Sequence, residues 1–387
     1  MKAVTCHEGR LAVETVPDLV PDKGQILIDV TRCGICGSDL HARTCSDVTA
    51  DGAAEIGYDA FMRHTDTVVM GHEFTGTIAS YGPGCRKRWP IGTRVVALPM
   101  LRQPDGIHLS GLSERAPGGY AEQMLVAEEL TFPVPDGLSD DLAATTEPMA
   151  VAHHAVRRSE IGRREVAVVI GCGPIGLAVI LMLKARGVRT VVASDLSATR
   201  RDLAVKCGAD VVVDPTLASP WTAYGERRGH VRTATGLFEL ALGTVRTLRR
   251  VPGLPWARVM RAAQKAGAGP RGPVVFECVG VPGMIEDVIS NAPLLSRVVV
   301  VGVCMQPDTF RPSMAINKEI DLRFVFAYGP DEFYETLQMI ASGSVDPTPL
   351  VTGVVGLDGV EGAFAALASA DRHAKILIDP RSDVVEV

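Results

Sequence analysis

The stretch from Cys33 to His41, CGICGSDLH, places two thiols, a carboxylate and an imidazole within a short span. A thioredoxin-type redox pair would need Cys33 and Cys36 at the start of a helix after a strand, and the flanking glycines and β-rich surroundings disfavour that arrangement. A structural zinc site would need a second cysteine or histidine pair, and nothing nearby supplies a second C-x-x-C. The role of the two thiols therefore depends on partners elsewhere in the chain.

Three residues elsewhere offer the missing partners. His72 and Glu73 follow the apolar run Val68–Met70, and Glu147 stands before a proline near the middle of the chain. One thiolate, one imidazole and one or two carboxylates form a catalytic type of zinc site, with an open position for water or substrate. The alternative is that a single cysteine or histidine in an apolar setting belongs to the core.

A second motif, Gly171-Cys172-Gly173-Pro174-Ile175-Gly176, reads G-x-G-x-x-G between an apolar strand and an apolar helix. The first glycine permits a tight turn, the second admits a pyrophosphate and the third lets helix and strand pack closely. The phosphates would lie at the helix N-terminus. Asp195 ends the next strand and could accept hydrogen bonds from the adenosine ribose, which favours NAD over NADP. Arg200 follows and could contact the adenosine half. The alternative is a glycine-rich turn that binds nothing.

The elements that would position these residues fall into two groups. Residues 1–150 contain short β-rich runs bounded by glycine and proline, such as 26–30, 75–79 and 94–98. From about residue 151 to 330, uniformly apolar strands alternate with helical segments, which predicts a parallel sheet flanked by helices. A helix near 332–340 and a strand at 375–378 end the chain. We expect an α/β protein with one domain from 1–150 plus 331–387 and another from 151–330.

The motifs occur together in an order that resembles the zinc-dependent medium-chain alcohol dehydrogenase family: Cys36–His41, Gly71–Glu73, Gly119–Glu122, Glu147–Ala150 and Gly171–Gly176. The resemblance covers nearly the whole chain except residues 42–66 and about 217–262. The Glu147-Pro148 form is similar to the polyol, butanediol and threonine dehydrogenase branch. The resemblance implies a GroES-like β-rich catalytic domain joined to a Rossmann nucleotide domain.

The resemblance also implies the zinc ligands. Cys36 and His72 would be ligands, while Glu73 and Glu147 would compete with water for the remaining positions. Cys33 would pack in the core. Asp39 would orient His72 through its other ring nitrogen, although it could simply cap a helix.

Roles in the reaction follow from the same resemblance. Ser38 would take the proton of the alcohol and pass it through the nicotinamide ribose to His41. Ile175 would press on the nicotinamide ring. The turn at Val301–Val303 would offer backbone groups to the carboxamide.

The sequence departs from the family in two places. The lobe after Ala97 carries no cysteine, so we expect one catalytic zinc ion per chain and no structural zinc. Residues 42–66 are longer than expected and are predicted to form a loop beside the substrate cleft. Cys45, Asp47, Tyr58 or His64 could reshape the pocket there, and Cys45 with His64 as extra ligands is a further alternative.

Composition limits the class of protein. The 387 residues are 47% hydrophobic and 22% charged, as in folded soluble proteins. The net charge of −6 gives no reason to expect nucleic acid as a partner. Nine cysteines suit reduced thiols and a cytoplasmic location, and no secretory signal is visible. Residues 166–183 lack charge, but internal glycines and a proline favour strand, turn and helix over a membrane span.

Two segments bear on assembly. The insert at about 217–262 is strongly basic and contains an amphipathic helical stripe around Leu237, Val245 and Leu248. It could be a surface helix packed on its own domain, or a contact with a subunit, a partner or an anionic surface. By analogy, the apolar strand 321–328 would extend a sheet into a partner, giving a homodimer or homotetramer. The alternative is an internal edge strand covered by a loop.

These observations favour an NAD- and zinc-dependent dehydrogenase that converts a secondary alcohol, diol or polyol to a ketone or aldehyde. A zinc-free quinone or enoyl reductase of the same superfamily is the alternative within enzymes, although it would lack Cys36, His72 and Glu73. A nucleotide-sensing scaffold without turnover is the alternative from another class. The sequence does not identify the small alcohol substrate.

Overall fold

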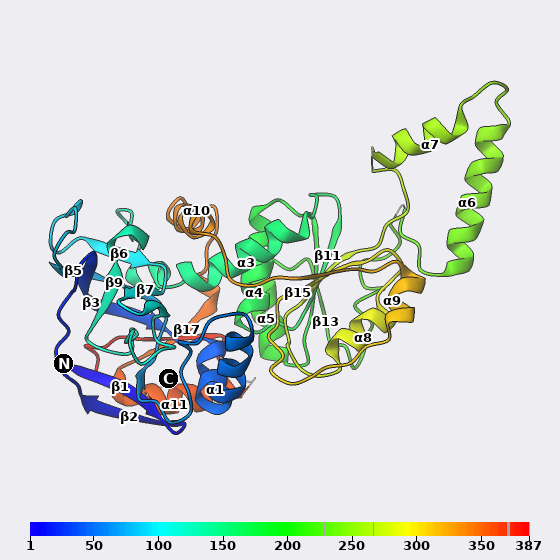
Figure 1. Cartoon of the computed structure of the whole chain (residues 1–387). Helices are drawn as coiled ribbons and strands as arrows, with labels where there is room; N and C mark the ends of the chain where they lie inside the picture. Colours follow the sequence, from blue (N-terminus) through cyan, green and yellow to red (C-terminus); the bar gives the residue numbers. More distant parts are fainter. Residues whose placement is uncertain (228, 266, 370–371, 387) are drawn as a thin grey trace. The chain divides into compact units, whose positions relative to one another are not determined.

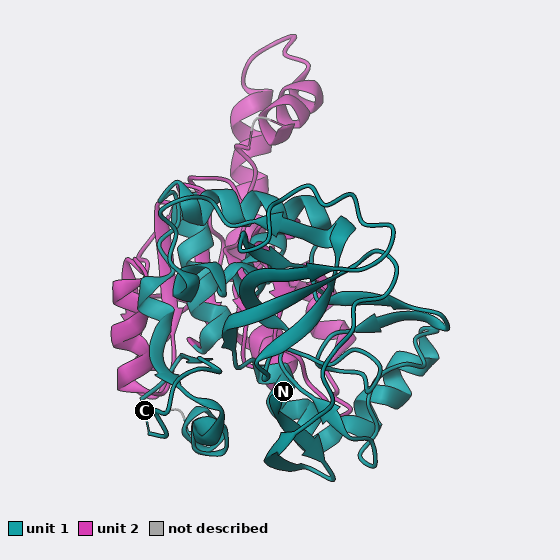
Figure 2. Ribbon diagram, turned by 90° about the vertical axis from the view of Figure 1, so that its left-hand side faces the viewer, with its two compact units in different colours: residues 1–154, 173–185, 327–387 teal, residues 155–172, 186–326 magenta. Residues whose placement is uncertain are grey.

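The computed structural model describes residues 1–227, 229–265, 267–369 and 372–386. The chain divides into two compact units (Figure 2). Unit 1 comprises residues 1–154, 173–185 and 327–387, and unit 2 comprises residues 155–172 and 186–326. Among the described residues, no helix is both long and apolar enough to cross a lipid bilayer.

Unit 1 is built mainly on antiparallel strands whose inward side chains are apolar, and among the strand pairs of its described residues only β17 with β18 is parallel. The largest sheet has the order β10-β6-β5-β3-β18-β17, with β9 also paired to β3. Smaller sheets are β2-β1-β4 and β7-β8. The strands are β1 (Lys2–His7), β2 (Arg10–Thr15), β3 (Gln25–Gly34), β4 (Val68–Val69), β5 (Glu73–Tyr81), β6 (Arg94–Ala97), β7 (Met100–Gln103), β8 (Gly106–Leu109), β9 (Gln123–Ala127), β10 (Thr131–Pro133), β17 (Val351–Val355) and β18 (Lys375–Ile378).

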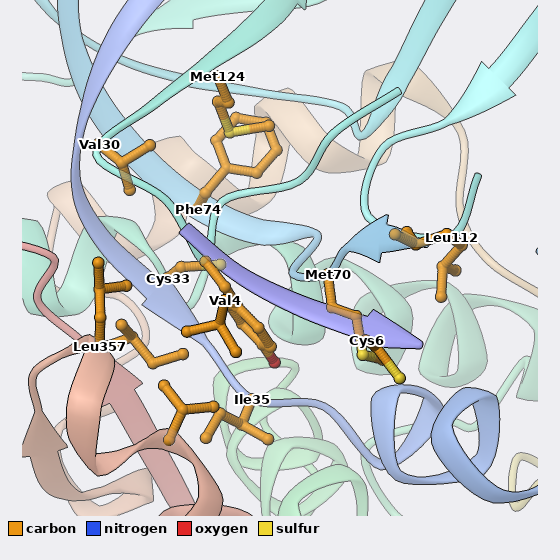
Figure 3. Close-up of a cluster of buried hydrophobic side chains, with 14 of the residues drawn as sticks. Val4, Cys6, Val30, Cys33, Ile35, Met70, Phe74, Leu112, Met124 and Leu357 are labelled. Carbon is orange, nitrogen blue, oxygen red and sulfur yellow. The ribbon is translucent and has the colours of Figure 1, made fainter. Parts of the chain in front are cut away.

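The core of unit 1 contains Cys33. Its side chain is fully buried in a cluster with Val30, Met70 and Phe74 (Figure 3). Burial raises the pKa of the Cys33 thiol well above its ordinary value, with smaller contributions from nearby carboxylates. A neutral, buried thiol of this kind packs as a small apolar side chain.

Helices complete unit 1. They are α1 (Gly37–Glu55), α2 (Asp140–Ala143), α4 (Pro174–Ala185), α10 (Pro330–Ala341) and α11 (Val360–Ala368), with short 3₁₀ turns at Glu128–Leu130, Thr348–Leu350 and Leu357–Gly359, while α3 (Thr146–Ser159) runs from unit 1 into unit 2. The expectation of a loop over residues 42–66 is wrong for its first half, because α1 continues to Glu55 with a kink at Cys45. Nothing in residues 42–51 stops a helix, since proline is absent and alanine recurs.

Unit 2 contains the predicted parallel sheet. Its order is β13-β12-β11-β14-β15-β16, and each neighbouring pair is parallel (Figure 1). The central strands are valine-rich and buried. The elements are β11 (Val166–Ile170), β12 (Thr190–Ser194), β13 (Val211–Val213), β14 (Val274–Glu277), β15 (Arg297–Val300), β16 (Asp321–Phe324), α5 (Ala198–Lys206), α6 (Ala234–Arg249), α7 (Trp256–Lys265), α8 (Met284–Asn291) and α9 (Pro312–Lys318).

The edge strand β16 is shorter than the predicted strand 321–328. It ends at Phe324, and Tyr328 belongs to unit 1. The basic insert contributes α6 and α7, which stand apart from the sheet of their own unit (Figure 1).

Candidate active site

The pairing of β3 with β5 places the predicted zinc ligands together. Gly34 at the end of β3 is opposite Glu73 at the start of β5. A side chain at position 34 would collide with the Glu73 carboxylate, so glycine is required there. Two residues after Gly34, Cys36 forms the N-cap of α1, and its backbone N–H donates to Asp39 Oδ2 at 2.9 Å. This cap fixes the first turn of the helix.

Cys36, His72 and Glu73 form the candidate metal centre. Each offers one ligand atom, and these atoms lie within 4.8 Å of one another. In the described part of the chain they are the one group of three or more such residues brought that close. Thiolate, imidazole and carboxylate are donors that zinc accepts. Cys45 and His64 lie outside the group.

The two ring nitrogens of His72 have different neighbours. Nε2 lies 3.1 Å from Ser38 Oγ, and Nδ1 lies 3.2 Å from Asp39 Oδ1 without the alignment of a hydrogen bond. Burial alone would lower the pKa of His72, but the Asp39 carboxylate raises it well above its ordinary value. Asp39 thus both caps α1 and faces the imidazole.

Asp39 stays ionised although it is buried. The hydroxyl of Tyr120 donates to Oδ2 at 2.6 Å. Burial acts to raise the pKa of Asp39, but His72, Tyr120 and the Cys36 N–H together lower it below its ordinary value. A charged Asp39 suits a residue that orients a metal-binding histidine.

Lys375 is a site residue that the sequence did not reveal. Its Nζ donates to both Glu73 oxygens, at 2.6 and 2.7 Å, and to the carbonyl of Ile35 at 2.9 Å. Both side chains of the ion pair are buried. Burial would lower the pKa of Lys375, but Glu73 raises it. The feature of the sequence that could have identified Lys375 is its position as a lone lysine at the start of an apolar strand, Lys375-Ile376-Leu377-Ile378.

Glu147 lies in the first turn of α3, beside this group but outside the set of three. Burial raises the pKa of Glu147 to about 7, with His72 lowering it and Glu73 raising it. The hydroxyl of Tyr328 hydrogen-bonds its carboxylate. Tyr328 was expected in a subunit-contact strand, so the sequence missed this contact.

Two side chains of the segment predicted as a loop, residues 42–66, accept hydrogen bonds from backbone N–H groups. Tyr58 accepts a hydrogen bond from the Leu109 N–H at 2.8 Å, and Asp47 accepts one from the His64 N–H at 3.0 Å.

Ser38 and His41 are three residues apart on α1, so they lie on neighbouring positions of one helix face.

The glycine-rich turn follows β11 in unit 2. Gly171 has φ +87°, and its N–H donates to the Ser194 carbonyl at 2.9 Å. An added Cβ at Gly171 would lie 2.7 Å from Val279. The Asp195 carboxylate accepts from the N–H groups of Cys172, at 2.7 Å, and Ser197, at 2.8 Å. Asp195 therefore anchors the turn, and the helix expected to open from this motif is α4, which begins at Pro174.

The other residues expected to contact the cofactor lie in different environments. The Nε of Arg200 is buried without a hydrogen-bond partner in the described residues. The N–H of Val301 already donates to the Glu277 carbonyl at 2.8 Å, whereas Val303 is exposed. Ile175 lies in the first turn of α4.

Comparisons with known proteins agree with this geometry. Residues 22–136 match the alcohol dehydrogenase GroES-like domain, and residues 174–247 match the zinc-binding dehydrogenase family. The chain is 30% identical to (R,R)-butanediol dehydrogenase of Bacillus subtilis, covering 98% of this chain and 100% of that one. It is 27% identical to (R,R)-butanediol dehydrogenase of Neisseria gonorrhoeae, covering 98% and 99%.

A solved structure supports the same assignment. The crystal structure of 2R,3R-butanediol dehydrogenase from Bacillus subtilis matches with a TM-score of 0.74 and 29% identity, covering 98% of this chain and 99% of that one. The predicted GroES-like and Rossmann architecture is thereby confirmed. The chain belongs to the zinc-dependent medium-chain alcohol dehydrogenase family, in its polyol and butanediol dehydrogenase-like branch.

Proposed function

We propose that this enzyme oxidises a secondary alcohol, vicinal diol or polyol to a ketone or aldehyde with NAD and zinc. The observation that carries the proposal is the close approach of ligand atoms from Cys36, His72 and Glu73. The relatives named for butanediol support a small diol as the substrate class. The catalytic domain would be residues 1–150 with 331–387, and the nucleotide domain residues 151–330.

The zinc ion would be held by Cys36, His72 and one carboxylate. Glu73 is closer to the other two donors, but Lys375 contacts both of its oxygens. Glu147 carries a raised pKa and a hydrogen bond from Tyr328. We therefore propose that the two carboxylates exchange at the third position. When bound, zinc supplies a Lewis acid that makes the alcohol proton easier to remove.

Proton transfer would fall to residues of α1. Ser38 is 3.1 Å from His72 Nε2, so its hydroxyl already faces the metal donors. Nε2 is the ring nitrogen of His72 that would hold the metal ion, and Ser38 would then be released from this contact. The freed Ser38 hydroxyl would accept the alcohol proton while passing its own through the nicotinamide ribose to His41, which would carry it toward solvent. Asp39 would keep the imidazole of His72 oriented throughout.

The glycine-rich turn would bind NAD, which supplies the hydride acceptor. The N–H groups at the start of α4 would face the pyrophosphate. Asp195 would accept from the adenosine ribose and repel a 2′-phosphate, which favours NAD over NADP. Arg200 has a buried Nε available for the adenosine half. We further propose a cytoplasmic homodimer or homotetramer, with reduced thiols and β16 at the exposed sheet edge as support.

The test is NADH formation by purified, zinc-loaded enzyme with secondary alcohols, vicinal diols, polyols and threonine. We expect turnover of a diol or polyol that stops on zinc chelation and returns on readdition. Cys36→Ser should lose both zinc and turnover, whereas Cys33→Ala, a matched thiol removal in the core, should retain bound zinc. Turnover that survives chelation, or quinone reduction by metal-free enzyme, would contradict the proposal and favour the zinc-free reductase.

A further inference from the structure

The basic insert forms an arm that is attached to unit 2 at both of its ends. We define the arm as residues 231–270, of which the structure describes all but 266. At its base, the Arg271 N–H donates to the Gly229 carbonyl at 2.8 Å, and His230 pairs with Arg271 in an isolated bridge. The chain therefore leaves and re-enters the body of unit 2 at neighbouring positions.

Among the described residues, the helices of the arm bury no side chain. α6 has 16 residues and α7 has 10, and none of these described residues is buried. Phe238 and Leu242, one turn apart on α6, are 64% and 68% exposed, and Trp256 at the start of α7 is 38% exposed. Isolated helices of this length are marginal in water, and helices in proteins gain most of their stability from a packed apolar face. The arm therefore needs another surface to pack against.

Charge indicates what that surface is. The arm carries seven basic residues and one acidic residue, a net charge of +6. Because the whole chain carries −6, the remaining residues carry −12. Two arms therefore repel each other, whereas an arm and the body of a second chain attract.

We propose that the arm docks on the acidic body of a second copy of this chain. On α7, Arg258, Arg261 and Lys265 recur at helical spacing on one face, while Trp256 and Val259 lie on the opposite face. The arm thus offers both complementary charge and apolar area to the partner body. An anionic lipid surface would attract the arm but repel the body that carries it.

The first experiment removes the arm. Residues 232–269 are replaced by a short Gly/Ser link, which the paired stem at Gly229–Arg271 can accommodate. Molar mass is then measured by light scattering and sedimentation equilibrium at low and high salt. We expect the wild-type chain to be oligomeric and the deletion to lower the mass at least twofold. High salt should weaken the wild-type assembly, since it screens the attraction.

A pair of charge-matched variants separates docking from net charge. Arg258→Glu, Arg261→Glu and Lys265→Glu are combined in α7, and Arg10→Glu, Arg86→Glu and Arg88→Glu form the control outside the arm. All these side chains are exposed, so folding should be preserved. We expect only the α7 variant to raise the dissociation constant of the oligomer, at least tenfold.

Several outcomes would overturn the proposal. A monomeric wild-type chain, an unchanged mass after deletion, or equal effects of the two triple variants would each do so. Arm-dependent sedimentation with phosphatidylserine vesicles, with the mass unchanged, would assign the arm to a membrane surface instead. No residue of the candidate active site lies in the arm. NADH formation therefore tests the proposed function separately, and its absence in every variant and the wild type would leave the mass measurements unaffected.

Discussion

Replacing Lys375 by methionine should strongly destabilise unit 1 in the metal-free protein. The Glu73 carboxylate is fully buried, and Lys375 is the cation within hydrogen-bonding distance of both its oxygens. Removing one partner of a buried ion pair typically costs about 3–5 kcal/mol, because the remaining charge stays uncompensated. That is a large part of the roughly 5–15 kcal/mol by which domains are stable.

A double-mutant cycle tests this reasoning. Glu73→Met alone should cost a similar amount, since it leaves Lys375 buried without its partner. The double variant Lys375→Met with Glu73→Met should lie within about 1 kcal/mol of the wild type, because an apolar pair of similar size removes the desolvation penalty of both ions. Urea unfolding can be followed at Trp89, the tryptophan of unit 1, after Trp221 and Trp256 are changed to phenylalanine.

Zinc provides an independent readout of the same pair. With Lys375 gone, Glu73 is free to meet a metal ion, so zinc affinity should rise and zinc should recover part of the lost stability. A cost below about 1 kcal/mol for Lys375→Met, or strictly additive single substitutions, would refute the view that the pair is a coupled unit. Unchanged zinc affinity would show that Lys375 does not compete for Glu73.

Two further predictions concern Asp195 and Glu147. Asp195→Asn keeps an acceptor for the turn but removes the charge, and it should raise the ratio of kcat/KM for NADP over NAD roughly 10-fold to 100-fold. In zinc-free protein, the pKa of Glu147 is raised from 4.5 to about 7 by burial. Because the folded value lies above the unfolded one, the contribution of Glu147 to stability is fully present at low pH and is lost as pH rises. About 3 kcal/mol should be lost as pH rises from about 4.5 to 7. Glu147→Gln should abolish that slope, and a slope that persists would contradict the assignment.

Local patterns were enough to predict the parallel sheet of unit 2 and to single out Cys36, His72 and Glu73 as candidate metal ligands. Valine-rich strands such as β11 and β14 have no polar face, so burial of both faces could be inferred from their residue types alone. Cys36 and His72 stand in short motifs at defined spacing. By contrast, Lys375 meets Glu73 from 302 residues away, through the pairing of β18 with β3. No local pattern encodes such a contact.

Tyr328 and α1 show two other limits. The apolar run from 321 to 328 suggested one strand, but the chain leaves the sheet after Phe324. Tyr328 instead hydrogen-bonds the Glu147 carboxylate. The helix over residues 42–55 was missed because comparison with a family treats an unmatched stretch as a loop. Its own composition, rich in alanine and free of proline, favours helix.

The pairing of β18 with β3 has a consequence for synthesis. Domains tend to fold in the order in which they leave the ribosome. Cys36, His72 and Glu73 emerge early, and all of unit 2 follows before Lys375 is made. For most of translation the three donors therefore exist without the cation that balances Glu73. Because unit 1 includes β18, its fold and the ion pair that balances Glu73 are completed only after the whole of unit 2 has been made.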